Sequence, residues 1–242
     1  MIKFFRQIRQ RLLSEGKTTK YLKYAIGEIV LVVIGILIAL SINNWNEERK
    51  QRQKETVNLT AIKDDLENDL NTEFNPGISY YSNRNKDLSR LREFYLNKEI
   101  IPKDSLLKYF RSNLGLWNII LNKGAFENLK STGIDIISND SLRTKISSLY
   151  SNGYPEIENR VNMVNQFYAY EFRPILHDNM ILYDSTLSHD DFNDLKSNKR
   201  NGNRIMEYYG LRIWLFARLE LIKEKVELLI ADIDKELERL DK

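Results

Sequence analysis

Cysteine is absent from this chain of 242 residues, and proline, glycine and histidine are scarce, with four, ten and two copies. Without cysteine there is no disulfide, no Cys-ligated zinc, no iron–sulfur cluster, no thiol catalysis and no lipoprotein acylation. The hydrophobic share of 42% supports a core of ordinary size, and the length suits one or two domains. These proportions exclude both an intrinsically disordered chain and a small disulfide-stabilised protein.

The net charge of +3 is unevenly distributed along the chain. Residues 1–24 carry seven Lys or Arg against one acid, Glu15, whereas residues 47–242 hold 30 basic and 32 acidic side chains. We expect residues 1–24 to be a basic amphipathic leader in the cytoplasm that lies on an anionic leaflet; the alternative is a basic tail that only sets topology. The nearly neutral body offers no basic surface for phosphates, so we expect no nucleic acid partner.

Residues 25–42 form an apolar run with a single charge, Glu28. As a helix, this run would be about 27 Å long, which matches the hydrocarbon core of a bilayer. Twelve of its eighteen residues are Ile, Leu or Val. Together they favour insertion into the bilayer by about 5 kcal/mol, whereas one charge at the centre of the helix would oppose insertion by only about 3 kcal/mol. We predict a transmembrane helix in the lipid bilayer, with Tyr21, Tyr24 and Trp45 as interface anchors.

More basic residues precede the apolar run than follow it, which places the N-terminus in the cytoplasm and the chain beyond residue 42 across the membrane. The alternative is a cleaved signal peptide, because residues 39–41 (Ala-Leu-Ser) resemble a small-x-small cleavage site. The long basic leader and the full-length apolar run favour an uncleaved anchor.

Three residues of the run are candidates for a contact between transmembrane helices. Gly35 and Ala39 form a small-xxx-small pair, which would let two copies of the helix pack closely as a homodimer. Glu28 is an ionisable group inside the span, so it is a candidate proton-sensitive switch or helix contact. The alternative for Glu28 is a side chain that reaches the headgroups or a neighbouring lysine.

Helical periodicity continues after the membrane. Leu59, Ile62, Leu66 and Leu70 lie at steps of three and four residues. They predict a helical stalk over residues 43–74, which residues 75–77 (Asn-Pro-Gly) should end. Residues 75–242 should form a helical domain packed with the stalk.

Further helices are predicted in that domain at residues 78–97, 125–131 and 142–150, with the last closing before Gly153. Another should begin at Pro155 and be ended or kinked by Pro174. A heptad-like apolar seam marks the last helix, over residues 203–241: Leu219, Ile222, Val226, Leu229, Ile233, Leu237 and Leu240. Antiparallel pairing of this helix with the stalk would bury both stripes.

The segment KYLKYAIGEIVLVVIGILIALSINNWN (residues 20–46), together with the opening MIKFFRQIRQRLL, resembles the N-terminus of a bacterial family of single-pass membrane proteins known only as a domain of unknown function. The segment AFENLKSTGIDIISNDSLRTKISSLY (residues 125–150) is similar to an internal motif of that family. The resemblance implies a location in the inner membrane of a bacterium with two membranes, and it implies no activity.

The sequence contains no motif for catalysis, a metal or a cofactor, so we expect no enzyme, no cofactor and no metal site. Asp64, Asp65, Glu67 and Asp69 should form a solvated helix face. Aromatic residues should pack in the core or line a ligand pocket: Trp117, Tyr150, Tyr154, Phe167, Tyr168 and Tyr170.

The sequence thus predicts an all-α protein, with one N-terminal transmembrane helix that continues into a helical bundle in the periplasm. Its expected function is a non-catalytic interaction or scaffold module for an unknown protein partner. The alternative is a periplasmic small-molecule sensor or accessory subunit that works through a separate transducer.

Overall fold

The computed structural model describes residues 18–98, 100–179 and 189–241. Within these ranges the chain is helical and contains no strand, so the all-α prediction is confirmed. The predicted leader lies outside the described residues as far as residue 17. The chain divides into two compact units, Met1–Lys54 and Glu55–Lys242.

The described part of the first unit is the beginning of helix α2 (Thr18–Asp69). This helix contains an 18-residue apolar window of which none is buried, and it is long and apolar enough to span a membrane. Large apolar side chains such as Ile29 and Leu31 are 64% and 65% exposed. They pack against no core among the described residues, which is typical of a helix surrounded by lipid.

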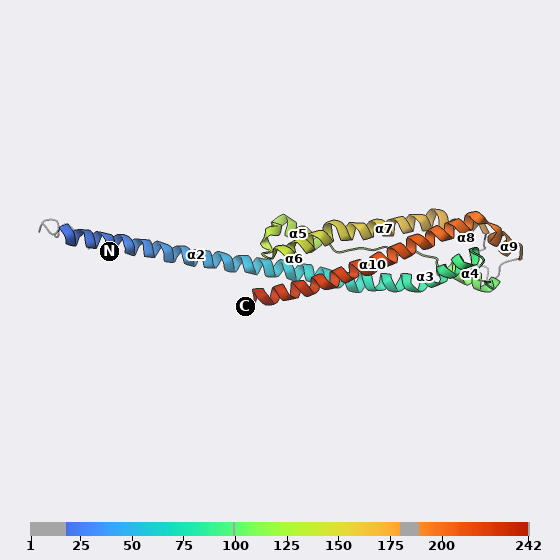
Figure 1. Cartoon of the computed structure of the whole chain (residues 1–242), viewed down its shortest axis with the longest axis horizontal. Helices are drawn as coiled ribbons and strands as arrows, with labels where there is room; N and C mark the ends of the chain where they lie inside the picture. Colours follow the sequence, from blue (N-terminus) through green and yellow to red (C-terminus); the bar gives the residue numbers. More distant parts are fainter. Residues whose placement is uncertain (1–17, 99, 180–188, 242) are drawn as a thin grey trace. The chain divides into compact units, whose positions relative to one another are not determined.

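Three long helical rods build the second unit (Figure 1). The first rod consists of residues 55–69 of α2, η1 (Leu70–Phe74) and α3 (Asn75–Tyr95). The second consists of α6 (Asp140–Ser148), η3 (Leu149–Gly153), α7 (Tyr154–Phe167), η4 (Tyr168–Phe172) and α8 (Arg173–Asn179). The third is α10 (Lys199–Leu240). Shorter helices connect them: α4 (Lys103–Ser112), α5 (Gly124–Thr132), η2 (Ile134–Ile136) and α9 (His189–Ser197).

Two of the connections follow local signals in the sequence. The side chain of Asn139 caps α6 by accepting a hydrogen bond of 3.1 Å from the backbone N–H of Leu142. Gly133 follows α5 with a φ of 106°, a conformation that glycine adopts without strain. These two residues fix where α5 ends and where α6 begins.

Three prolines lie inside the rods, and each is preceded by a π-helical segment that ends two residues earlier. The pairs are η1 with Pro76, η3 with Pro155 and η4 with Pro174. In an α-helix a proline ring clashes with the carbonyl four residues before it, and a wider π turn relieves that clash. The predicted helix ends at residues 75–77 and before Gly153 are therefore wrong, because the rods continue through both positions. Pro174 was predicted to end or kink its helix, and the end is wrong because the rod continues into α8.

Helix α10 packs against α3 and α7 and shares the core with them. Its predicted seam is buried at Leu219, Ile222, Val226, Leu229 and Ile233. The ammonium of Lys63 in α2 lies 2.6 Å from Asp234 Oδ1 in α10, so the stalk and the C-terminal helix are in contact at this position. Most of the partners of α10 nevertheless lie on α3 and α7 rather than on the stalk.

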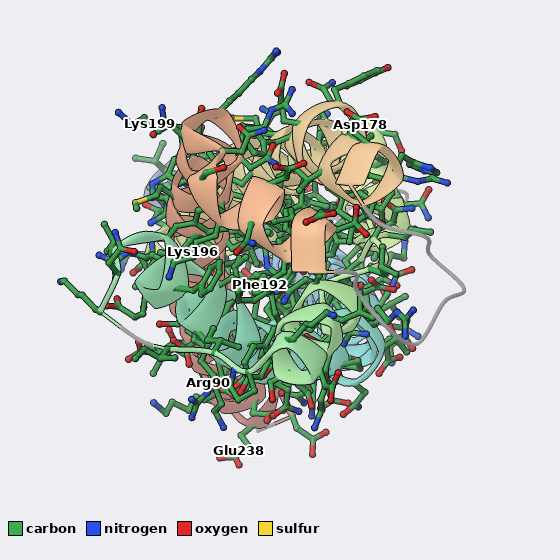
Figure 2. All side chains as sticks on the ribbon, turned by 90° about the vertical axis from the view of Figure 1, so that its right-hand side faces the viewer. Arg90, Asp178, Phe192, Lys196, Lys199 and Glu238 are labelled. Carbon is green, nitrogen blue, oxygen red and sulfur yellow. The ribbon has the colours of Figure 1, made fainter. Side chains whose placement is uncertain are left out.

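One end of this bundle is closed by α9 (Figure 2). Phe192 lies near the centre of the end view, whereas Asp178, Lys199 and Glu238 lie at its rim. The ring centroid of Phe192 is 5.8 Å from that of Phe94. The aromatic core of the described residues thus continues through Phe192 to this end of the bundle.

Most of the aromatic residues predicted for the core are buried there. Tyr150, Tyr154 and Tyr168 have 6% exposure or less, and Phe167 and Trp117 pack against the core while partly buried. Tyr170 is 75% exposed, so its assignment to the core or a pocket is wrong. It follows Tyr168 by two residues, which turns it to the opposite side of the helix.

Candidate functional site

The predicted transmembrane contacts share one face of α2. Glu28, Gly35 and Ala39 are separated by seven and four residues, which places them on the same side of a helix. Gly35 and Ala39 are exposed, and Glu28 is of intermediate exposure. A Cβ atom added to Gly35 would meet nothing within 4 Å, so this face is open to another helix.

Of the three predicted interface anchors, only Trp45 has a described side chain. It is 62% exposed, and the guanidinium carbon of Arg49 lies 5.6 Å from its ring centroid. A tryptophan beside a cation suits the headgroup region of a bilayer. Tyr21 and Tyr24 belong to α2, but their side chains lie outside the described residues.

A cleft of about 440 Å³ lies between α10 and the rod formed by α6, η3 and α7. Its floor is apolar and includes Leu149, Ile222 and Leu229, each at most 6% exposed. Leu228 stands at the cleft with 61% of its surface exposed. Gly153 also lines the cleft, and a Cβ added to it would lie 3.2 Å from Leu149 and 3.4 Å from Ile222. A volume of this size is typical of small-molecule sites.

Two ion pairs join the walls of the cleft. Lys145 Nζ lies 2.6 Å from Asp232 Oδ2, and Arg218 pairs with Glu156. The hydrogen bond from Lys145 lowers the pKa of Asp232 more than partial burial raises it. Burial alone would raise the pKa of Glu156, but hydrogen bonds from Arg160 and Arg218 outweigh it and lower the pKa. Both carboxyl groups are therefore ionised at neutral pH.

Lys225 is the remaining cation of the cleft. It is exposed, and in the part of the chain that the structure describes it has neither an ion pair nor a hydrogen bond from its ammonium. Arg218 is paired with Glu156, and its Nε is buried without a hydrogen-bond partner. The cleft therefore combines an apolar floor with uncompensated positive charge.

A row of carboxylates on the first rod binds the irregular segment before α5 and the first turn of α5. Asp65 accepts a hydrogen bond of 3.0 Å from the backbone N–H of Ala125, and Glu73 accepts one of 3.2 Å from that of Ile120. Between them, Asp69 binds Asn122. These bonds satisfy backbone groups that no helix satisfies. The prediction of a solvated face is therefore wrong for Asp65 and Asp69, while Asp64 and Glu67 are exposed as expected.

Asp69 is fully buried. Its Oδ1 accepts hydrogen bonds from the backbone N–H and from Nδ2 of Asn122, at 3.0 and 2.7 Å, and its Oδ2 accepts one of 2.8 Å from the Tyr154 hydroxyl. Burial raises the pKa of Asp69 more than these hydrogen bonds lower it. The Asp69 carboxyl group has a structural role, because its hydrogen bonds connect the end of α2 to Asn122 and to the start of α7.

A second buried carboxylate network lies where α2, α6 and α10 meet. Glu55 accepts hydrogen bonds of 2.8 and 3.0 Å from the N–H and hydroxyl of Ser138. Arg239 donates to the Ser138 hydroxyl and to Glu236, and Glu236 accepts a further bond from Asn139. This network ties the start of α6 to the end of α10.

Arg212 is buried to 1% exposure without a carboxylate partner among the described residues. Its Nη1 donates to Asn113 and Tyr208, and the guanidinium carbon lies 4.8 Å from the ring centroid of Tyr81. Its Nε and Nη2 have no partner. The burial of Arg212 could have been predicted from the sequence, because this residue lies seven residues before Leu219 and therefore on the same buried face of α10.

Comparison with known proteins identifies the family. A family model described as "Family of unknown function (DUF6090)" matches residues 28–199, which is well over half of the chain. No curated protein and no solved structure matches significantly. The match includes residues 28–42 of the apolar run and most of the second unit, so the resemblance to a domain of unknown function is confirmed. This chain belongs to the DUF6090 family of unknown function.

Proposed function

We propose that this protein is a single-pass protein of the bacterial inner membrane that acts by binding and not by chemistry. Its N-terminus lies in the cytoplasm, and its helical domain lies in the periplasm. One observation carries the membrane assignment: the 18-residue apolar window of α2 has no buried part. Lipid is the environment that suits such a surface, and the excess of Lys and Arg before it supports the orientation.

Reporter fusions at the C-terminus test the orientation. Alkaline phosphatase, which is active only after export, should be active at this position, and a fluorescent protein that folds only in the cytoplasm should stay dark. The reverse pattern would reject the periplasmic domain. An immunoblot of cells that express the chain without a reporter should detect the full 28.7 kDa protein without a shorter species. Loss of about 40 residues would indicate a cleaved signal peptide.

The transmembrane face that contains Gly35 and Ala39 supports a homodimer within the membrane. Replacing Gly35 with Leu should weaken self-association in a membrane two-hybrid assay. An added Cβ at Gly35 meets nothing within 4 Å among the described residues, so the variant should leave the monomer unstrained. Val33→Leu, on another face of the helix, is the matched control. An unchanged signal for Gly35→Leu would exclude this contact.

The scaffold function implies a protein partner, which co-purification in mild detergent from native membranes should retain in a fixed ratio.

A second function, a small-molecule sensor or accessory subunit that works through a separate transducer, is favoured by the cleft beside η3. Native mass spectrometry of the purified protein separates the two, since a bound small molecule adds a discrete mass without a second polypeptide. A preparation with neither would count against both functions.

A further inference from the structure

The cleft beside η3 is elongated along α10. Its residues on that helix run from Arg218 to Asp232, which is about 21 Å at 1.5 Å per residue. The opposite wall is formed by residues 144–156. Because the floor between them is apolar, the cleft suits a chain-like apolar group better than a compact polar molecule.

The charges of the cleft define what else its ligand should carry. Three cations and two carboxylates line it, and each carboxylate is already paired across the cleft. Lys225 lies seven residues from Arg218 and seven from Asp232, so its unpaired ammonium stands midway between the ion pairs. An anionic group on the ligand would therefore find a partner at Lys225, while a cationic group would find none.

We propose that this cleft binds a single-chain anionic amphiphile. The hydrocarbon chain lies on Leu149, Ile222 and Leu229, and the carboxylate or phosphate head pairs with Lys225. This inference rests on the second proposed function, in which the helical domain binds a small molecule. It gives that function a ligand class: long-chain carboxylates or single-chain phospholipids.

Photo-crosslinking of the full chain in its native membrane tests this assignment. The probe is a hexadecanoic acid with a diazirine in its chain, and labelled peptides are identified by mass spectrometry. We expect label in the peptides that contain residues 144–156 and 218–232, in addition to label in the membrane span. Excess hexadecanoate should remove the label from the cleft peptides. Label in the span alone would overturn the assignment and leave the membrane anchor intact.

Two pairs of variants control for position. Lys225→Glu should reduce the cleft label about fivefold or more, because it replaces an attraction with a repulsion. Lys86→Glu makes the same charge change at an exposed position of α3 and should have no effect. Ser148→Trp should fill the cleft and abolish labelling, whereas Ser151→Trp, exposed on the same rod but outside the cleft, should not. Equal labelling of all four variants would refute the site.

A neutral probe separates the ligand class from the binding function. The corresponding hexadecanol probe should label the cleft weakly. If the hexadecanol probe labels as strongly as the acid, the cleft binds apolar chains but the anionic class is wrong. If neither probe labels the cleft, the inference fails, and native mass spectrometry of the purified protein still decides the sensor function. Competition by hexadecanoate and by a lysophospholipid distinguishes a carboxylate head from a phosphate head. Protection of the cleft by a co-purifying polypeptide would identify a protein occupant and overturn the proposal.

Discussion

The hydroxyl of Tyr154 donates a hydrogen bond of 2.8 Å to Oδ2 of Asp69, and both side chains are completely buried. The two residues are 85 positions apart, at the end of α2 and the start of α7. Each lies beside a π segment, since Asp69 directly precedes η1 and Tyr154 directly follows η3. The bond therefore fixes the first rod against the second where both depart from α-helical geometry.

Removal of the Asp69 carboxylate should destabilise the helical domain. Asp69→Ala leaves the Asn122 and Tyr154 donors unpaired, which should cost about 3 kcal/mol, or roughly 6 to 12 °C in Tm. Asp69→Asn should cost less than about 1 kcal/mol, because its Oδ1 still accepts from Asn122 and its Nδ2 can donate to the Tyr154 oxygen. Thermal unfolding followed by circular dichroism measures both. Equal losses in the two variants would contradict the hydrogen-bond account.

The same residue predicts a pH dependence of stability. The folded-state pKa of Asp69 is raised by burial, so folding favours its protonated form. Its contribution to stability is full below the unfolded pKa, about 3.9, and is lost as pH rises through the higher folded pKa. Asp69→Asn does not titrate, so the Tm of wild type relative to this variant should fall between pH 4 and neutrality. A relative Tm that rises over that range would show that the pKa is lowered instead.

Two glycines in helices should respond to alanine in opposite directions. At Gly77 an added Cβ would lie 2.9 Å from Nε1 of Trp117, whereas at Gly210 it would meet nothing within 4 Å. Gly77→Ala should therefore destabilise the protein by about 1 to 2 kcal/mol. Gly210→Ala should stabilise it by up to about 1 kcal/mol through helix propensity. Urea denaturation measures both, and Trp117→Leu should reverse the sign at Gly77. If it does not, the close approach of the indole is not the cause.

Arg212 should be replaceable by a hydrophobic residue. Burial of the Arg212 guanidinium is unfavourable because the charge loses its hydration. The hydrogen bonds to Asn113 and Tyr208, at 3.3 and 3.2 Å, offset little of that free energy, and no carboxylate among the described residues pairs with the charge. Arg212→Met keeps the length of the side chain and should leave the free energy of unfolding unchanged or raise it by about 1 kcal/mol. Arg212→Ala, which creates a cavity, should lower it by about 2 kcal/mol or more. A large loss in the Met variant would indicate that the cation is compensated.

The helices and the core seam were predictable because they depend on local spacing. The seam residues Leu219, Ile222, Val226, Leu229 and Ile233 are buried as their heptad spacing requires, and Asn139 caps α6 as its type suggests. The breaks predicted at residues 75–77 and before Gly153 were wrong because a proline clashes with the preceding α-helical turn but is accommodated after a π turn. Whether a rod continues through Pro76 depends on packing at both of its ends, and no local pattern encodes that.

The candidate sites were less predictable than the fold. Asp65 and Asp69 look like a solvated face because nothing in the sequence brings residues 120–125 beside them. The cleft is likewise formed by residues about 70 positions apart, whose meeting depends on how α10 lies against α6 and α7. The transmembrane face, by contrast, follows from helical spacing alone, and the proposed roles of Glu28, Gly35 and Ala39 stay predictions.

Extraction of membranes from cells with alkaline sodium carbonate tests the membrane anchor most directly. The full chain should stay in the membrane pellet, because its apolar helix is held by lipid and not by surface charge. A variant with two charges placed in the centre of the run, Val33→Arg with Leu37→Arg, should be released or lost. Recovery of the unaltered chain in the supernatant would contradict the account.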